Sequence, residues 1–208
     1  LKMQKKSKIC LIDLGSGNVG SVKNILKYLN VDFCVTNTES DIKKSSHLIL
    51  PGVGSFGSLM KKIIDTKFDK IFEEEVIMKK KYYLGICVGM QILAKYGHEF
   101  GKFKGVGAID GEVRKIDSKD FPLPHIGWNN IEIKKDSLLF SDINNNADFY
   151  FVNSYALKCN HENDILSTTN YNEKFVSSIQ KENIFGVQFH PEKSQQDGIK
   201  LIKNFVSI

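Results

Sequence analysis

The residues best suited to chemistry lie around one cysteine, in the segment Gly85-Ile86-Cys87-Val88-Gly89. Small residues two positions before and two positions after a nucleophile, between a strand and a helix, are typical of a nucleophile elbow. The nucleophile of such a turn has a strained backbone, so its neighbours on the packed side must lack bulk. The N-terminus of the following helix favours the reactive thiolate. The alternative is a small buried hydrophobic residue, but the flanking glycines favour a nucleophile.

A cysteine nucleophile needs a base and a group that orients this base. His190 is the best placed of the five histidines, because it follows an expected strand in Gln188-Phe189-His190-Pro191-Glu192. Pro191 stiffens the chain, and a turn at the strand end can bring Glu192 back to the imidazole. Glu192 would then fix the tautomer of His190 and stabilise the imidazolium, as the acid of a serine triad does. Alone, this segment would indicate a surface turn; with Cys87 it indicates a Cys-His-Glu triad.

Acyl transfer also requires N–H donors that stabilise an oxyanion. The backbone N–H of Val88, directly after the nucleophile, is one candidate. The N–H of Val53 is the other, because glycines on both sides of it, Gly52 and Gly54, allow the peptide to flip toward a substrate. The alternative for this second segment is an ordinary turn between a strand and a helix.

The elements that must position these residues alternate in the first half of the chain. Strands are expected over residues 8–13, 32–36, 47–50 and 82–86, and helices after Asn18, after the loop at 51–55, over 68–80 and over 88–95. Asn18 is expected to cap its helix. The second half predicts short strands over 105–109, 112–116, 129–133, 148–152, 175–179 and 184–189, the last two as a hairpin, and a helix over 195–206. This pattern predicts one α/β domain over residues 8–207, with a mixed, mostly parallel sheet flanked by helices and extended by antiparallel strands.

Composition excludes several other classes of protein. The 208 residues are 41% hydrophobic and 25% charged, as in ordinary globular proteins. The net charge of +5 comes from lysines interspersed with acids, and Arg114 is the only arginine, which disfavours nucleic-acid binding. No apolar run approaches the roughly 20 residues of a membrane span. We expect residues 1–7 to precede the domain, Met3 to be a natural start, no signal peptide, and a cytoplasmic location.

The four cysteines are far apart and form no CxxC pair, so neither a disulfide framework nor a metal site is expected, and no cofactor is implied.

The segments Gly85–Gln91, Gln188–Ser194 and Pro51–Phe56 together resemble the class I (triad-type) glutamine amidotransferases. Two further segments, Pro124–Asn129 and Phe149–Val152, narrow the resemblance to the branch that provides the glutaminase subunit of imidazole glycerol phosphate synthase. The resemblance extends from Ile9 to Phe205. Two positions depart from it: Val88 stands where the family usually has leucine, and Asn153 where this branch usually has histidine.

The resemblance implies that L-glutamine is hydrolysed to glutamate and ammonia. Cys87 would form a γ-glutamyl thioester, His190 would protonate the leaving ammonia and then activate water, and Glu192 would orient His190. The residues that would hold glutamine are Gln91 and Glu99, helped by the backbone of Gly54, Ser154 and Tyr155. Those that would face the partner subunit are Asn18, Trp128 and Lys193.

The implied partner is an eight-stranded βα barrel, which would receive the ammonia within a heterodimer and make imidazole glycerol phosphate and AICAR in histidine biosynthesis.

Three other functions stay open at this point. A paralogous glutaminase could supply ammonia for an acetamidino group on a surface-polysaccharide or flagellin sugar, and Asn153 favours this alternative. Another Cys-His hydrolase, such as a peptidase or γ-glutamyl hydrolase, could share the fold. A non-enzymatic scaffold subunit could retain a relic pocket. Among the softer assignments, Trp128 could be a core residue, Lys193 a plain surface residue and Glu99 an ordinary loop acid.

Overall fold

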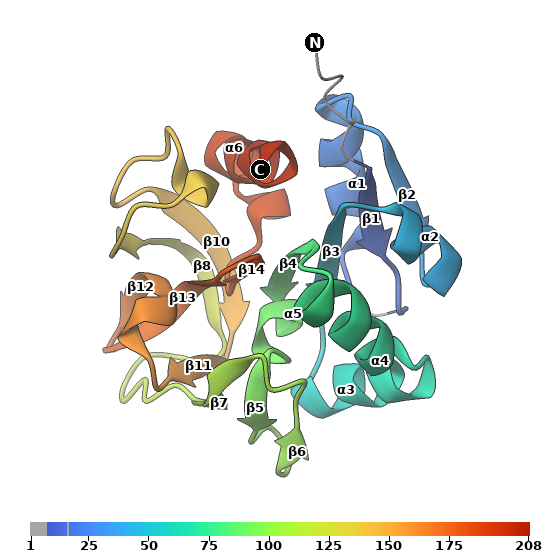
Figure 1. Ribbon diagram of the computed structural model, residues 1–208. Coiled ribbons are helices and arrows are strands. Elements are labelled where there is room, and N and C mark those ends of the chain that lie inside the picture. The colour runs from blue at the N-terminus through green and yellow to red at the C-terminus, as the bar shows by residue number, and fades with distance from the viewer. Residues whose placement is uncertain (1–7, 16) are drawn as a thin grey trace.

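The computed structural model describes residues 8–15 and 17–208; the expected start segment 1–7 lies outside the described residues. Figure 1 shows a central sheet with helices packed against it and smaller sheets beside it. The first half contains β1 (Ile9–Ile12), α1 (Val19–Tyr28), β2 (Phe33–Thr36), α2 (Glu39–Lys44), β3 (His47–Gly52), α3 (Phe56–Asp65), α4 (Phe68–Phe72) with a π-helical continuation (Glu73–Met78), β4 (Tyr82–Cys87) and α5 (Val88–Gln91).

Strands dominate the second half of the chain, as the sequence predicts. They are β5 (Ala94–Gly97), β6 (Phe103–Lys104), β7 (Ile109–Lys115), β8 (His125–Asn130), β9 (Glu132–Ile133), β10 (Asp148–Asn153), β11 (Tyr155–Cys159), β12 (Ile165–Tyr171), β13 (Glu173–Lys181) and β14 (Ile184–Val187). Short 3-10 turns lie at Leu138–Phe140, Glu162–Asp164 and Pro191–Lys193, and α6 (Gln195–Ser207) closes the chain.

The main sheet has the strand order β2-β1-β3-β4-β14-β13-β12-β9. Its first five strands are parallel, and the strands from β13 outward are antiparallel. Two smaller sheets have the orders β10-β8 and β11-β7-β5-β6. The predicted α/β class, with a mixed, mostly parallel sheet and antiparallel additions, is therefore confirmed.

The parallel pairing of β14 with β4 explains how distant parts of the sequence meet. Val187 lies opposite Ile86, so both strands end at the same edge of the sheet. Figure 1 shows the two strands side by side at the centre of the molecule. Cys87 is the last residue of β4, and His190 follows shortly after β14. The pairing thus places both residues at one edge.

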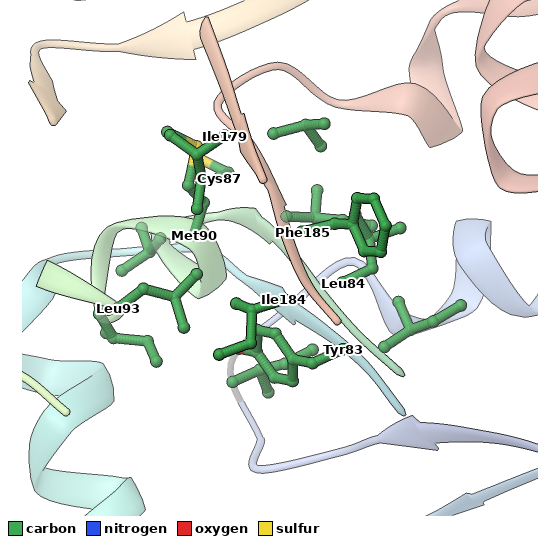
Figure 2. Packing of buried hydrophobic residues seen from close by; sticks show 14 of the residues in the cluster. Tyr83, Leu84, Cys87, Met90, Leu93, Ile179, Ile184 and Phe185 are labelled. Carbon is green, nitrogen blue, oxygen red and sulfur yellow. The ribbon is translucent and has the colours of Figure 1, made fainter. Parts of the chain in front are cut away.

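The core is built on the two central strands. Tyr83 and Leu84 of β4 and Phe185 of β14 are each at most 2% exposed, and Met90 of α5 packs with them (Figure 2). Such strands are covered on both faces, which is why they read as continuous apolar runs. Cys87 belongs to the same cluster and is held by rigid, packed elements. No helix in the described part of the chain has the length and apolar character of a membrane span.

Several predicted boundaries are wrong. The helix expected over 88–95 ends at Gln91, and the chain then forms β5, which pairs with β7. No strand covers 105–108, and β7 begins only at Ile109. Gly105 instead passes so close to β5 that a Cβ there would stand 2.1 Å from the carbonyl oxygen of Ala94. The strand expected over 129–133 is divided between β8 and β9, and α2, β11 and β12 were not predicted.

Candidate active site

The turn at Cys87 has the strained geometry expected of a nucleophile elbow. Cys87 has φ 55° and ψ −113°, a conformation that side-chain-bearing residues rarely adopt. A Cβ on Gly85 would stand 2.2 Å from the carbonyl oxygen of Gly89, and a Cβ on Gly89 would stand 2.0 Å from that of Leu50. Both distances are far below van der Waals contact, so the two glycines are required for the backbone to pass.

The imidazole of His190 connects Cys87 to Glu192. His190 Nδ1 lies 2.8 Å from Glu192 Oε1, and the two side chains are 5% and 0% exposed. The Cys87 thiol lines the same cavity as His190 and is close enough to raise the pKa of its ring. Because Nδ1 is paired with Glu192, Nε2 is the ring nitrogen left to exchange a proton with the Cys87 sulfur. The structure therefore places the three side chains predicted as a triad next to one another, with His190 and Glu192 hydrogen-bonded.

The charge state of His190 follows from its two neighbours. Burial by itself lowers the pKa of His190, but contact with Cys87 and Glu192 outweighs burial and raises the pKa to about 10. At neutral pH the imidazolium is therefore the favoured form. An imidazolium beside a cysteine is the arrangement that activates a cysteine nucleophile. This pairing matters more here than the helix dipole, since α5 has only four residues.

Glu192 has a second partner that the sequence did not suggest. Asn18 does not cap α1 with its side chain; instead its Nδ2 donates to Glu192 Oε1 at 3.4 Å, the oxygen that His190 also uses. The other oxygen, Oε2, is buried and finds no partner among the described residues. Asn18 thus supports the carboxylate that orients the imidazole.

The turn that carries His190 and Glu192 is fastened to β10. The backbone N–H of His190 donates to the carbonyl oxygen of Tyr150 at 2.8 Å. The hydroxyl of Ser194 donates to the carbonyl oxygen of His190 at 2.6 Å and accepts from the N–H of Tyr150 at 3.0 Å. These bonds fix the imidazole relative to the neighbouring sheet.

A cavity of about 280 Å³ opens onto the thiol and the imidazole. Nearly every residue predicted to act on the substrate lines this cavity: Cys87, His190, Val53, Val88, Gly54, Gln91, Glu99, Ser154 and Tyr155. Lys193 lines it as well, together with Pro124, Val152 and Asn153. The predicted oxyanion and glutamine-binding residues, drawn from four separate stretches of the chain, therefore surround one space.

Two of these side chains already have partners in the protein. Gln91 Nε2 donates to the carbonyl oxygen of Tyr155 at 3.0 Å and to Gln188 Oε1 at 2.9 Å. Glu99 Oε2 accepts from the N–H of Phe56, the first residue of α3, at 2.9 Å. The groups left to bind a substrate are therefore the side-chain amide oxygen of Gln91, Oε1, and the other carboxylate oxygen of Glu99, Oε1.

Gln188 is a site residue that sequence reasoning missed. Its side chain is fully buried, and its Nε2 donates to Cys87 Sγ at 3.6 Å while its Oε1 accepts from Gln91. Gln188 therefore orients both the nucleophile and a cavity residue. The available signal was a polar residue directly after the apolar run of β14, a position that is rarely polar without a partner.

Asn153, the departure noted in the sequence, lines the cavity at the end of β10. Its Nδ2 donates to the carbonyl oxygen of Tyr155 at 3.1 Å, which fixes the orientation of the amide. Its Oδ1 is buried and has no partner among the residues described.

Two of the three residues expected to face a partner, Trp128 and Lys193, meet at one tyrosine. Trp128 on β8 is 47% exposed, and its ring meets the edge of Tyr150 with centroids 6.0 Å apart. Lys193 places its ammonium 5.6 Å from the centroid of the same Tyr150 ring. Trp128, Tyr150 and Lys193 therefore form one patch, which reaches the cavity through Lys193. Asn18, the third residue, hydrogen-bonds to Glu192, which directly precedes Lys193.

A buried cysteine and histidine beside one cavity, with a buried carboxylate against the imidazole, form the arrangement that cysteine-triad acyl-transfer enzymes use. The family model for class I glutamine amidotransferases matches residues 10–208, and the chain belongs to this family.

Its relatives include imidazole glycerol phosphate synthase subunit HisH 1 of Campylobacter jejuni subsp. jejuni serotype O:23/36 (strain 81-176). The two sequences are 42% identical over 201 residues, covering 96% of this chain and all of the relative. Subunit HisH of Leptospira borgpetersenii is 41% identical over 204 residues, with 96% and 100% covered. The chain is thus a HisH-like glutamine amidotransferase.

Solved structures agree with this fold at lower sequence identity. PurLQS from Thermotoga maritima matches with a TM-score of 0.72 and 15% identity, over 97% of this chain and 98% of the other. A glutamine amidotransferase from the same organism matches with a TM-score of 0.68 and 16% identity, over 97% and 83%. These two similarities concern the fold alone.

Proposed function

We propose that this chain is the glutaminase subunit of an imidazole glycerol phosphate synthase, and that it hydrolyses L-glutamine to supply ammonia for histidine biosynthesis. The observation that carries the proposal is the meeting of Cys87, His190 and Glu192 beside one cavity. The HisH relatives, which match this chain over nearly its whole length, support the choice of pathway. We also take residues 8–207 as one amidotransferase domain.

In the proposed first step, the Cys87 thiolate attacks the side-chain carbonyl carbon of glutamine. The carbonyl oxygen becomes an oxyanion, which the N–H groups of Val88 and Val53 stabilise. His190 Nε2 gives its proton to the amide nitrogen as the carbon–nitrogen bond breaks. Ammonia leaves, and a γ-glutamyl thioester remains on the sulfur.

In the second step, neutral His190 takes a proton from water, and the resulting hydroxide attacks the thioester. The carbon–sulfur bond breaks, glutamate leaves, and the thiolate and imidazolium are restored. Glu192 stabilises the imidazolium of His190 each time the ring is protonated again. The imidazolium favoured by both neighbours suits the first step, because a proton must be available when ammonia leaves.

The substrate would be held by its α-amino acid end. Glu99 supplies a carboxylate oxygen for the α-ammonium group, and Gln91 and the backbone of Gly54, Ser154 and Tyr155 supply further polar groups. The cavity can take such a ligand because it is lined by both polar and apolar side chains.

Ammonia released into water at pH 7 would be protonated and lost as a nucleophile, so such a glutaminase needs an adjacent acceptor. We propose an eight-stranded βα barrel synthase as partner in a heterodimer, seated on the patch of Trp128, Tyr150 and Lys193. An exposed indole packed against a tyrosine ring supports this choice, because Trp and Tyr are enriched at interface hot spots.

The test compares two activities of the complex with its synthase subunit. In Cys87→Ser, glutamine-dependent synthesis and glutamate release should be lost, while synthesis driven by added ammonium salt should persist. Cys159→Ser, at a partly exposed cysteine that does not line the cavity, is the matched control and should keep both. Undiminished glutamate release by Cys87→Ser would contradict the proposal.

The same assay separates the other functions. Glutamine-dependent synthesis that occurs only with an amino-sugar synthase as partner would indicate that the chain acts in the paralogous pathway. Peptide cleavage without glutamine turnover would indicate a different hydrolase.

A further inference from the structure

Two cysteines outside the active site lie side by side at an edge of the main sheet. Cys10 of β1 and Cys34 of β2 are register partners in a parallel pair, so their side chains point to the same face. Neighbouring strands are about 4.8 Å apart, within the range of roughly 4.4–6.8 Å that disulfides span between Cα atoms. The backbone therefore already holds the two residues at a separation that a disulfide can bridge.

The two thiols lie on neighbouring strands but differ in exposure. Cys10 is fully buried, whereas Cys34 is partly exposed on β2, the outermost strand of the sheet. Cys34 Sγ lies 3.8 Å from the carbonyl oxygen of Ile9, the residue before Cys10, and Cys34 is close enough to raise the pKa of Cys10. A reagent from solvent would thus meet Cys34 first and find Cys10 directly behind it.

We propose that Cys10 and Cys34 form a thiol–disulfide site, in which Cys34 reacts with an oxidised low-molecular-weight thiol such as glutathione disulfide and Cys10 resolves the product. The Cys34 thiolate attacks one glutathione sulfur, and a glutathione thiolate leaves and takes up the proton that Cys34 lost. Cys10, as thiolate, then attacks the Cys34 sulfur and releases a second glutathione. Two protein thiols are oxidised and one glutathione disulfide is reduced, so atoms and electrons balance.

The second step is expected to be the slow one. Burial and the adjacent Cys34 raise the pKa of Cys10 to about 12, so little of it is thiolate at neutral pH. The mixed disulfide on Cys34 should therefore be observable first, and its conversion to the internal disulfide should accelerate as pH rises.

The internal disulfide would tie β2 to β1 and close the segment between them, which contains α1 and Asn18. An edge strand opens more readily than the centre of a sheet, and a cross-link restrains such opening. Oxidation should accordingly raise the melting temperature, and reduction should reverse the change.

The test uses the folded full chain carrying Cys87→Ser and Cys159→Ser, which leaves only this pair of cysteines. It is incubated with glutathione disulfide and analysed by intact mass and peptide mapping. We expect a transient glutathione adduct on Cys34, then loss of two hydrogens and a peptide linking Cys10 to Cys34, faster at higher pH. Adding Cys10→Ser should leave the adduct stable, and adding Cys34→Ser should leave the protein unmodified.

An adduct that persists on Cys34 with Cys10 present, or a cross-link that forms only in denaturant, would overturn the proposal. So would equal modification of the Cys34→Ser protein. None of these results depends on glutaminase activity, so they leave the proposed function unaffected.

Discussion

Removing the amide of Asn18 should slow glutamine hydrolysis without weakening glutamine binding. Asn18 Nδ2 donates a hydrogen bond to Glu192 Oε1, the same oxygen that is paired with His190 Nδ1. Asn18 does not line the cavity, so it should not contact glutamine. A hydrogen bond to a charged group contributes about 1.5–3 kcal/mol. At 3.4 Å this bond is long, so we take about 1 kcal/mol, which corresponds to a roughly fivefold fall in kcat for Asn18→Ala.

Asn18→Asp provides the sharper measurement because it keeps the shape and reverses the interaction. Its carboxylate would stand against that of Glu192 and repel it, so kcat should fall more than tenfold at neutral pH. Lowering the pH protonates the new aspartate, restores a donor, and should bring Asn18→Asp back toward the wild type. Asn18→Ala should show no such recovery.

The assay is glutamate release at saturating synthase subunit, with kcat and KM determined across pH. Asn24→Asp, at an exposed position on α1, the helix that follows Asn18, is the control for added charge. Identical pH profiles for Asn18→Ala and Asn18→Asp, or an effect on KM alone, would refute the reasoning. Because Asn18 is also predicted to face the partner, complex formation is measured separately; a loss explained wholly by weaker association would refute it as well.

Three further predictions follow from single contacts. Gly89→Ala places a Cβ 2.0 Å from the carbonyl oxygen of Leu50, so it should abolish glutaminase activity and destabilise the fold by about 1–3 kcal/mol in urea unfolding. The control, Gly20→Ala in α1, has open space around the new Cβ and should be neutral or stabilising. Equal effects of the two substitutions would contradict the steric account. Glu99→Gln can still accept from the Phe56 N–H but lacks the charge for the α-ammonium group, so KM for glutamine should rise at least tenfold with little change in melting temperature; an unchanged KM would exclude this role. Burial lowers the pKa of His47 from 6.5 to about 4. The unfolded chain therefore binds this proton more readily than the folded protein does. The contribution of neutral His47 to the free energy of unfolding is fully present above pH 6.5 and is lost as the pH drops toward 4. The loss by pH 5 should be about 2 kcal/mol by urea unfolding, and His47→Gln should flatten this slope; a wild-type curve that matches His47→Gln would contradict it.

The sequence was sufficient to predict that Cys87, His190 and Glu192 lie together, because the residues around them indicate the local backbone geometry. Glycines around Cys87 indicate a turn in which backbones nearly touch, and His190 with Glu192 follows a strongly apolar strand. The parallel pairing of β4 with β14, which brings these segments together, follows from the way buried strands end at a common edge.

The features that sequence reasoning missed depend on tertiary contacts. Residues 92–94 continue an apolar pattern that fits a helix, yet the chain turns because β5 pairs with β7. β12 contains buried hydroxyl residues such as Ser167, which is satisfied only by Ser177 and Ser178 on the neighbouring strand. Gln188 and Asn18 likewise act through partners distant in sequence, which a local pattern does not show.

The central claim is that the sulfur of Cys87 is the atom that attacks glutamine. The most direct test is labelling of the complex with 6-diazo-5-oxo-L-norleucine, a glutamine analogue that alkylates the attacking nucleophile, followed by peptide mapping. We predict one label per chain, on Cys87, formed in step with loss of glutamate release and slowed by glutamine. A label on Cys34, Cys159 or any other residue, with Cys87 unmodified and activity lost, would contradict the account.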